Sequence, residues 1–87
     1  MKFFKAESNA TIETRSSQNN DYAFAWFYRN ISKPDDIQIG ASFHMTLQAA
    51  QTNAKRYSKK NWLESIEIVP CVEITKEEFK QIRKVAA

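Results

Sequence analysis

Residues 21–29, D-Y-A-F-A-W-F-Y-R, form the most aromatic run of the chain and predict its clearest β-strand. Successive side chains of a strand point to opposite faces, so the four rings on one face form a single row: Tyr22, Phe24, Trp26 and Tyr28. The other face is nearly bare apart from Phe27 and Arg29. This row of rings either packs in the hydrophobic core or lies on the surface, where it can bind a partner. Small residues in the neighbouring segments favour the buried row, and this interpretation leaves Phe27 and Arg29 exposed.

The segments on either side of this strand also alternate between apolar and polar residues. Residues 2–14 predict a half-buried strand that can break near Ser8 and Asn9 and then folds back onto the aromatic strand. Residues 37–43 predict a third strand, in which Gly40 marks a bulge or a place where a neighbouring side chain lies over the backbone. The first three strands are therefore expected to form an antiparallel meander.

The second half of the chain carries two helix signals. Thr46 is a plausible N-cap for a helix over 47–60, and the T-x-x-E sequence from Thr75 to Glu78 is typical of a capping box at the start of another helix. Between them, residues 64–74 predict a strand that Pro70 places at a sheet edge or bends. The sequence thus predicts one α+β domain over residues 1–87, ordered β-β-β-α-β-α, with a mainly antiparallel sheet and both helices on one face.

Composition excludes several classes of site. The one cysteine, Cys71, cannot form an internal disulfide, and the one glycine rules out a glycine-rich phosphate loop. We find no spacing typical of metal ligands, so neither a metal nor a cofactor is expected. No stretch resembles a signal peptide or a membrane span, which leads us to expect a cytoplasmic protein without a membrane partner.

Catalytic candidates are sparse. His44 is the only histidine and has no neighbouring nucleophile in the sequence, so a structural or surface role is expected. Cys71 faces outward in the predicted strand beside Glu67 and Glu73, which disfavour its thiolate. We therefore do not expect an enzyme, and a small enzyme that uses His44 is only the third hypothesis.

Positive charge gathers in one place. The chain has 13 basic and 10 acidic residues, and the whole excess lies in residues 44–87. The end of the first predicted helix and the residues after it form a basic helix end, namely Lys55, Arg56, Lys59, Lys60 and Trp62. Such a cluster suits the negative end of a helix dipole, and it can also contact an acidic partner.

The leading hypothesis is a non-catalytic binding or regulatory module that docks on a protein or nucleoprotein partner. Small inhibitors and accessory proteins, including those of phages and mobile elements, have this size and lack a catalytic set. The expected contact surface combines Phe27 and Arg29 with the basic helix end. The alternative is single-stranded nucleic-acid binding, with bases stacked on the ring row and phosphates held by lysines. An exposed edge strand could also pair two copies into a homodimer.

Overall fold

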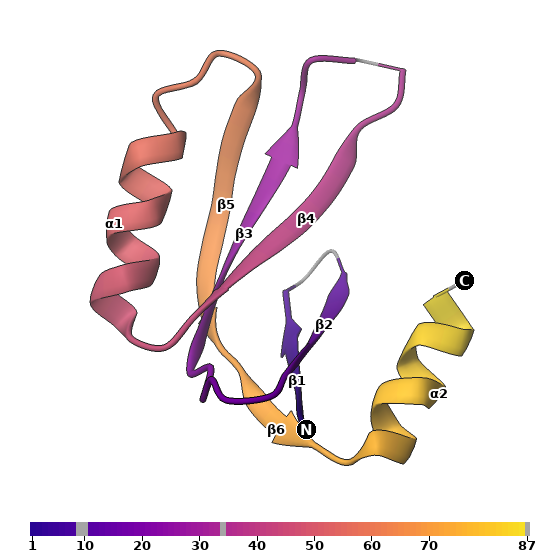
Figure 1. Ribbon diagram of the computed structural model, residues 1–87. Coiled ribbons are helices and arrows are strands. Elements are labelled where there is room, and N and C mark those ends of the chain that lie inside the picture. The colour runs from indigo at the N-terminus through magenta and orange to yellow at the C-terminus, as the bar shows by residue number, and fades with distance from the viewer. Residues whose placement is uncertain (9–10, 34, 87) are drawn as a thin grey trace.

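The computed structural model describes residues 1–8, 11–33 and 35–86. Within these ranges it contains six strands and two helices (Figure 1). In chain order they are β1 (Lys2–Glu7), β2 (Ile12–Ser17), β3 (Phe24–Asn30), β4 (Gln38–His44), α1 (Leu47–Tyr57), β5 (Leu63–Pro70), β6 (Val72–Ile74) and α2 (Lys76–Ala86). The predicted α+β class is confirmed.

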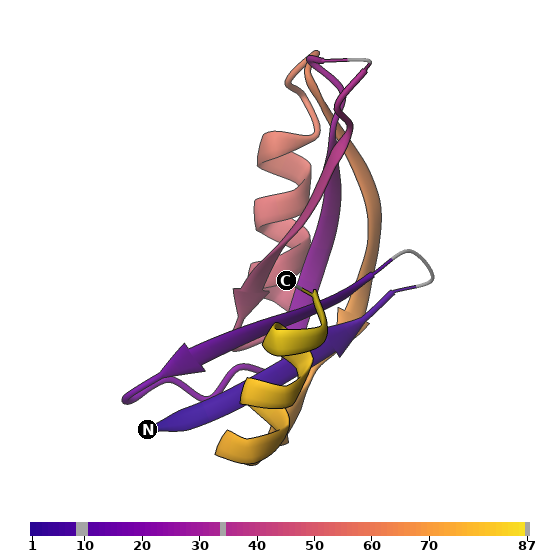
Figure 2. The same cartoon turned by 90° about the vertical axis from the view of Figure 1, so that its right-hand side faces the viewer.

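The strands form two antiparallel sheets rather than one. One sheet has the order β4-β3-β5 and the other β2-β1-β6. Figures 1 and 2 show α1 and α2 on opposite sides of the molecule, with the two sheets between them. The expectation that both helices cover one face of a single sheet is therefore wrong, because each helix packs on a different sheet.

The aromatic strand β3 is the centre of its sheet and pairs antiparallel with both β4 and β5. The long helix in the order β-β-β-α-β-α predicts a crossover that returns the next strand parallel to the first or third strand, and α1 does return the chain in the direction of β4. However, β5 pairs with β3 and not with β4, so no parallel pair forms among the described strands. The aromatic strand thus receives neighbours on both sides.

The segment before the aromatic strand forms a hairpin of its own. β1 and β2 pair with each other from Lys2↔Ser17 to Glu7↔Ile12, and the Ser8 amide donates to the Thr11 carbonyl in the turn. The expected break near Ser8 agrees with the end of β1 at Glu7, while Asn9 lies outside the described residues. The prediction that this segment pairs with the aromatic strand is wrong, because β1 pairs with β2 on one side and with β6 on the other.

Pro70 bends the chain where it was expected to. β5 ends at Pro70, β6 begins at Val72, and the two strands belong to different sheets. Between them, the amide of Cys71 donates to the carbonyl of Ala23 at 2.9 Å. β5 is also an edge strand, so both alternatives suggested by the proline hold.

The core lies between the two sheets as well as under α1. Phe27 and Ala25 on β3 and Ala6 on β1 are completely buried against one another, and half-buried side chains such as Phe43 and Ile66 pack around them. On the opposite face of β3, Trp26 is 2% exposed. Phe27 is 0% exposed, so its predicted exposure is wrong: the second sheet covers the face that was expected to be open.

Both helices begin at the expected caps. The Ala49 amide donates to Thr46 Oγ1 at 3.0 Å, and the Glu78 amide donates to Thr75 Oγ1 at 3.1 Å. The end of the first helix was placed too late, because α1 stops at Tyr57 and Ser58 is its C-cap. Lys59 and Lys60 therefore lie in the connection to β5.

Candidate aromatic groove

The structure splits the predicted ring row. Tyr22 precedes β3 and contacts Phe4 and Phe43, at ring-centroid distances of 5.4 and 5.8 Å. Phe24 is half-buried within β3, where it lies beside Pro70 of β5. Trp26 and Tyr28 face α1, and the centroids of their rings are 5.1 Å apart. A continuous four-ring platform is therefore not formed, because the strand starts after Tyr22 and α1 covers Trp26.

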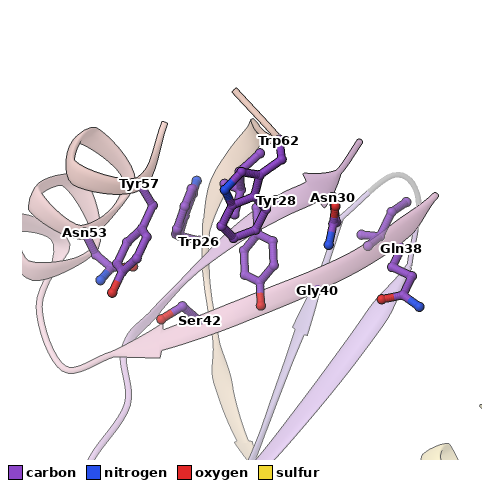
Figure 3. Close-up of a pocket in the computed structure, with 11 residues that line it drawn as sticks. Trp26, Tyr28, Asn30, Gln38, Gly40, Ser42, Asn53, Tyr57 and Trp62 are labelled. Carbon is purple, nitrogen blue, oxygen red and sulfur yellow. The ribbon is translucent and has the colours of Figure 1, made fainter. Parts of the chain in front are cut away.

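Beside α1, the uncovered part of this sheet face forms a hollow of about 480 Å³, which we call the aromatic groove. Four rings line it, from β3, α1 and the connection before β5: Trp26, Tyr28, Tyr57 and Trp62 (Figure 3). Uncharged polar side chains complete it, namely Asn30, Gln38, Ser42 and Asn53. None of the described residues that line the groove is charged, so it suits an apolar or aromatic group that also accepts or donates hydrogen bonds.

The four rings differ in exposure, and Tyr28 is half-buried. Trp62 is 44% exposed and Tyr57 is 37% exposed, whereas Trp26 forms the closed end of the groove. Trp26 is held in place by its indole N–H, which donates to Ser65 Oγ at 2.8 Å, and by Tyr57, whose ring stacks on it at 6.2 Å. A buried ring fixed by these two contacts thus lies beneath exposed aromatic contact area at the surface.

Gly40 allows Tyr28 to lie flat on the sheet. A Cβ at position 40 would stand 2.9 Å from the Tyr28 hydroxyl oxygen, closer than such atoms approach. Tyr28 and Gly40 are directly opposite each other in the register of β3 and β4. The expectation that a neighbouring side chain lies over this glycine is confirmed, and the contact shapes the floor of the groove (Figure 3).

The predicted partner-binding residues differ in their exposure to solvent. All members of the basic helix end are exposed: Lys55, Arg56, Lys59, Lys60 and Trp62. Lys59 and Lys60 lie between Tyr57 and Trp62, two of the groove-lining rings, so positive charge stands close to the groove. Arg29 is partly exposed and pairs with Glu64 at 3.8 Å across β3 and β5. Phe27 cannot take part because it is buried.

A second hollow of about 440 Å³ adjoins the first, and Asn53 lines both. His44 contributes to it, and its Nε2 lies 2.9 Å from Ser42 Oγ. Burial lowers the pKa of His44, while a hydrogen bond to Asn53 acts in the opposite direction. A neutral imidazole in this position can accept the Ser42 proton, which is one of the several elements that acyl transfer requires.

Stability should depend on His44 at mildly acidic pH. Since its folded pKa is lowered, the unfolded chain binds the proton more readily, and the free energy of unfolding should fall as pH drops from above 6.5 towards the folded pKa. Urea unfolding at several pH values would measure this. In His44→Gln the loss over this window should be smaller than in the wild type, and equal slopes in the two proteins would contradict the assignment.

Sequence reasoning missed Tyr57, Ser42 and Asn53 as members of the site. Ser42 and His44 are two residues apart on one strand and so share a face, a signal that was available. Tyr57 and Asn53 reach the groove only because α1 packs against β3 and β4.

The structure gives little support for a reactive thiol or a metal site. Cys71 is half-buried against the core between the sheets instead of facing outward, and burial raises the pKa of its thiol. Among the described residues, no group of three or more His, Cys, Asp or Glu side chains could hold a metal ion. None of the helices described here is long and apolar enough to cross a membrane.

No protein-family model, curated protein or solved structure matches this chain.

Proposed function

We propose that this chain is a non-catalytic binding module that docks on a protein partner through the aromatic groove and the basic helix end. The observation that carries the proposal is the groove itself, where exposed Tyr57 and Trp62 stand beside buried Trp26 and half-buried Tyr28. Tyrosine, tryptophan and arginine dominate the binding energy of protein interfaces, especially where they border a well-packed pocket.

The chemistry of the groove indicates what the partner presents. An uncharged, ring-lined hollow accommodates an aromatic or long apolar side chain, and the amides of Asn30, Gln38 and Asn53 can bond to the backbone beside it. Lys59 and Lys60 are exposed in the connection between the groove-lining residues Tyr57 and Trp62, and they favour acidic residues next to that anchor. The proposed partner segment is therefore an apolar anchor with acidic neighbours.

Single-stranded nucleic acid is the second candidate. Its support is the same juxtaposition of exposed rings and lysines, since a base can stack on Trp62 or Tyr57 while Lys59 and Lys60 contact phosphates. The ring row suggested by the sequence does not supply the stacking surface in this proposal, because Trp26 is buried and Tyr22 packs against Phe4. Of that row, only Tyr28 is both partly exposed and part of the groove. Because fewer rings are available for stacking bases, we rank nucleic-acid binding second.

Panning a random-peptide display library against the protein tests the leading proposal. We expect enrichment of peptides with an aromatic or large apolar residue flanked by Asp or Glu, and affinity that weakens as salt rises. In Trp62→Ala the dissociation constant of such a peptide should rise by about thirtyfold, the usual loss at an interface hot spot. Fluorescence titration of synthetic peptides would measure it.

Matched variants on the far side of the molecule control for general effects. Val72→Ala removes another exposed apolar side chain, from β6, and Lys80→Ala with Lys84→Ala removes two charges from α2. These variants should bind peptide like the wild type, whereas Lys59→Ala with Lys60→Ala should bind more weakly. If no peptide is enriched but an oligonucleotide binds in a Trp62-dependent manner, nucleic acid replaces protein as the partner. If neither binds, the docking proposal is wrong.

A further inference from the structure

Natural sheets protect their edge strands with charges, proline, bulges or short length, because an unprotected edge pairs with other chains. Three of the four edge strands in the described part of the chain carry such protection. β2 contains Glu13 and Arg15, β6 has only three residues, and β5 combines Glu64, Glu67 and Pro70 with a register shift against β3. The fourth edge strand is β4.

β4 has none of these devices. Its seven residues, Q-I-G-A-S-F-H, include no lysine, arginine, carboxylate or proline, and its pairing with β3 runs without a register shift from Asn30↔Gln38 to Phe24↔His44. On its other side no described strand pairs with it. A regular, uncharged edge of this length is a template for a further strand.

We propose that this strand is a second copy of the same chain, paired antiparallel through β4 around a twofold axis at Ala41. A twofold interface is self-complementary, so each contact occurs twice. With Ala41 on the axis, Gln38 of one copy lies opposite His44 of the other. The two three-stranded sheets then become one sheet of six strands.

The apolar residues at the two ends of β4 fit this arrangement. Ile37 is 53% exposed and Met45 is 56% exposed, and each stands four residues from Ala41. In the proposed register, Ile37 of one copy therefore lies opposite Met45 of the other. Cross-strand pairs of this kind stabilise sheets, and here the pair removes two exposed apolar side chains from water at each end of the interface.

The charges near β4 also complement each other across the axis. Asp35 and Asp36 are exposed just before the strand, and Thr46 caps α1 just after it. The first turn of α1 contains no acidic residue, although carboxylates stabilise this end of a helix. The proposed register brings Asp36 of one copy opposite Thr46 of the other, so the acidic turn approaches the positive end of the second copy's helix.

Dimerisation would also arrange the aromatic grooves. Gln38, Gly40 and Ser42 of β4 line the groove, on the α1 side of the sheet. A twofold axis perpendicular to the sheet keeps this side the same in both copies, so the two grooves open on one face. A partner with two suitable segments could then occupy both, and it would gain affinity without new contacts.

Sedimentation equilibrium of charge variants tests the register directly. The wild type should dimerise reversibly between low micromolar and millimolar concentration. Ile37→Lys combined with Met45→Lys puts like charges opposite each other twice and should raise the dissociation constant by about tenfold or more. Ile37→Glu combined with Met45→Lys puts opposite charges there and should restore dimerisation, although these positions are remote within one chain.

Two controls separate this interface from other effects. Ile12→Lys combined with Val72→Lys makes the same charge change at exposed apolar positions outside β4 and should leave dimerisation unchanged. Trp62→Ala should weaken peptide binding but not dimerisation. A wild type that stays monomeric throughout, or a doubly lysine-substituted variant that dimerises normally, would overturn the proposal. Failure of the oppositely charged pair to restore the dimer would overturn the register centred on Ala41.

Discussion

Phe27→Ala should lower the free energy of unfolding by about 3 to 5 kcal/mol, the usual cost of removing a fully buried phenylalanine ring. Phe27 is 0% exposed and packs between β1 and the β4-β3-β5 sheet, so the loss combines transfer of the ring with a cavity between the two sheets. A domain of this size is stable by about 4 to 13 kcal/mol. Urea denaturation should therefore reveal a large shift of the midpoint, or a partly unfolded variant.

The exposed Trp62 provides the control for this prediction. Trp62→Ala removes a larger ring, but from a position 44% in contact with water, so its effect on stability should be clearly smaller. If Phe27→Ala proved as stable as Trp62→Ala, the packing of the two sheets against each other would be refuted. A large loss of stability in Phe27→Ala, compared with Trp62→Ala, would show that β3 is buried on both faces. The alternation in its sequence suggests only one buried face.

Trp26→Ala is the second substitution with a large expected effect, again about 3 to 5 kcal/mol. Trp26 is buried under α1, stacks on Tyr57 and contacts Tyr28. Its removal should also open the floor of the aromatic groove, so peptide binding should weaken beyond the loss of folded protein. Thermal unfolding followed by circular dichroism, together with peptide titration of the folded fraction, would measure both effects.

Ser65→Ala isolates one part of the Trp26 contribution. It removes only the acceptor of the indole N–H, and the resulting loss should be about 1 to 3 kcal/mol because the donor is left without its partner. Trp26→Phe keeps most of the apolar ring and should fall between Ser65→Ala and Trp26→Ala. A Trp26→Ala variant with wild-type stability would contradict the position of this side chain between the sheet and α1.

Local features were predictable because a few neighbouring residues decide them. Thr46 and Thr75 cap helices wherever these helices pack, since the bonds they accept come from amides three residues further along the chain. Pro70 interrupts its strand because it has no amide proton to donate. The strand around Trp26 and the α+β class follow from the same local patterns. The overlong first helix shows the limit, because basic residues after Tyr57 are compatible with both a helix and a turn.

The candidate site was predictable only in part. The basic helix end, which includes Trp62, could be selected because its residues cluster in sequence, and they are exposed in the structure. Phe27 could not be placed correctly, because alternation assigns one buried face to a strand and cannot show that a second sheet covers the other. Tyr57 and Asn53 become groove residues only through the position of α1 on the sheet.

By itself, the sequence determined the extended aromatic strand, the two helix starts and the bend at Pro70, because each depends on backbone geometry and hydrogen bonding within a few residues. The tertiary structure alone decided which strands pair, that Phe27 and Trp26 are buried on opposite faces of β3, and that four rings meet in one groove. Those features depend on contacts between residues far apart in the chain. Such contacts depend on how whole faces of sheets and helices pack, and the alternation within one strand is compatible with several packings.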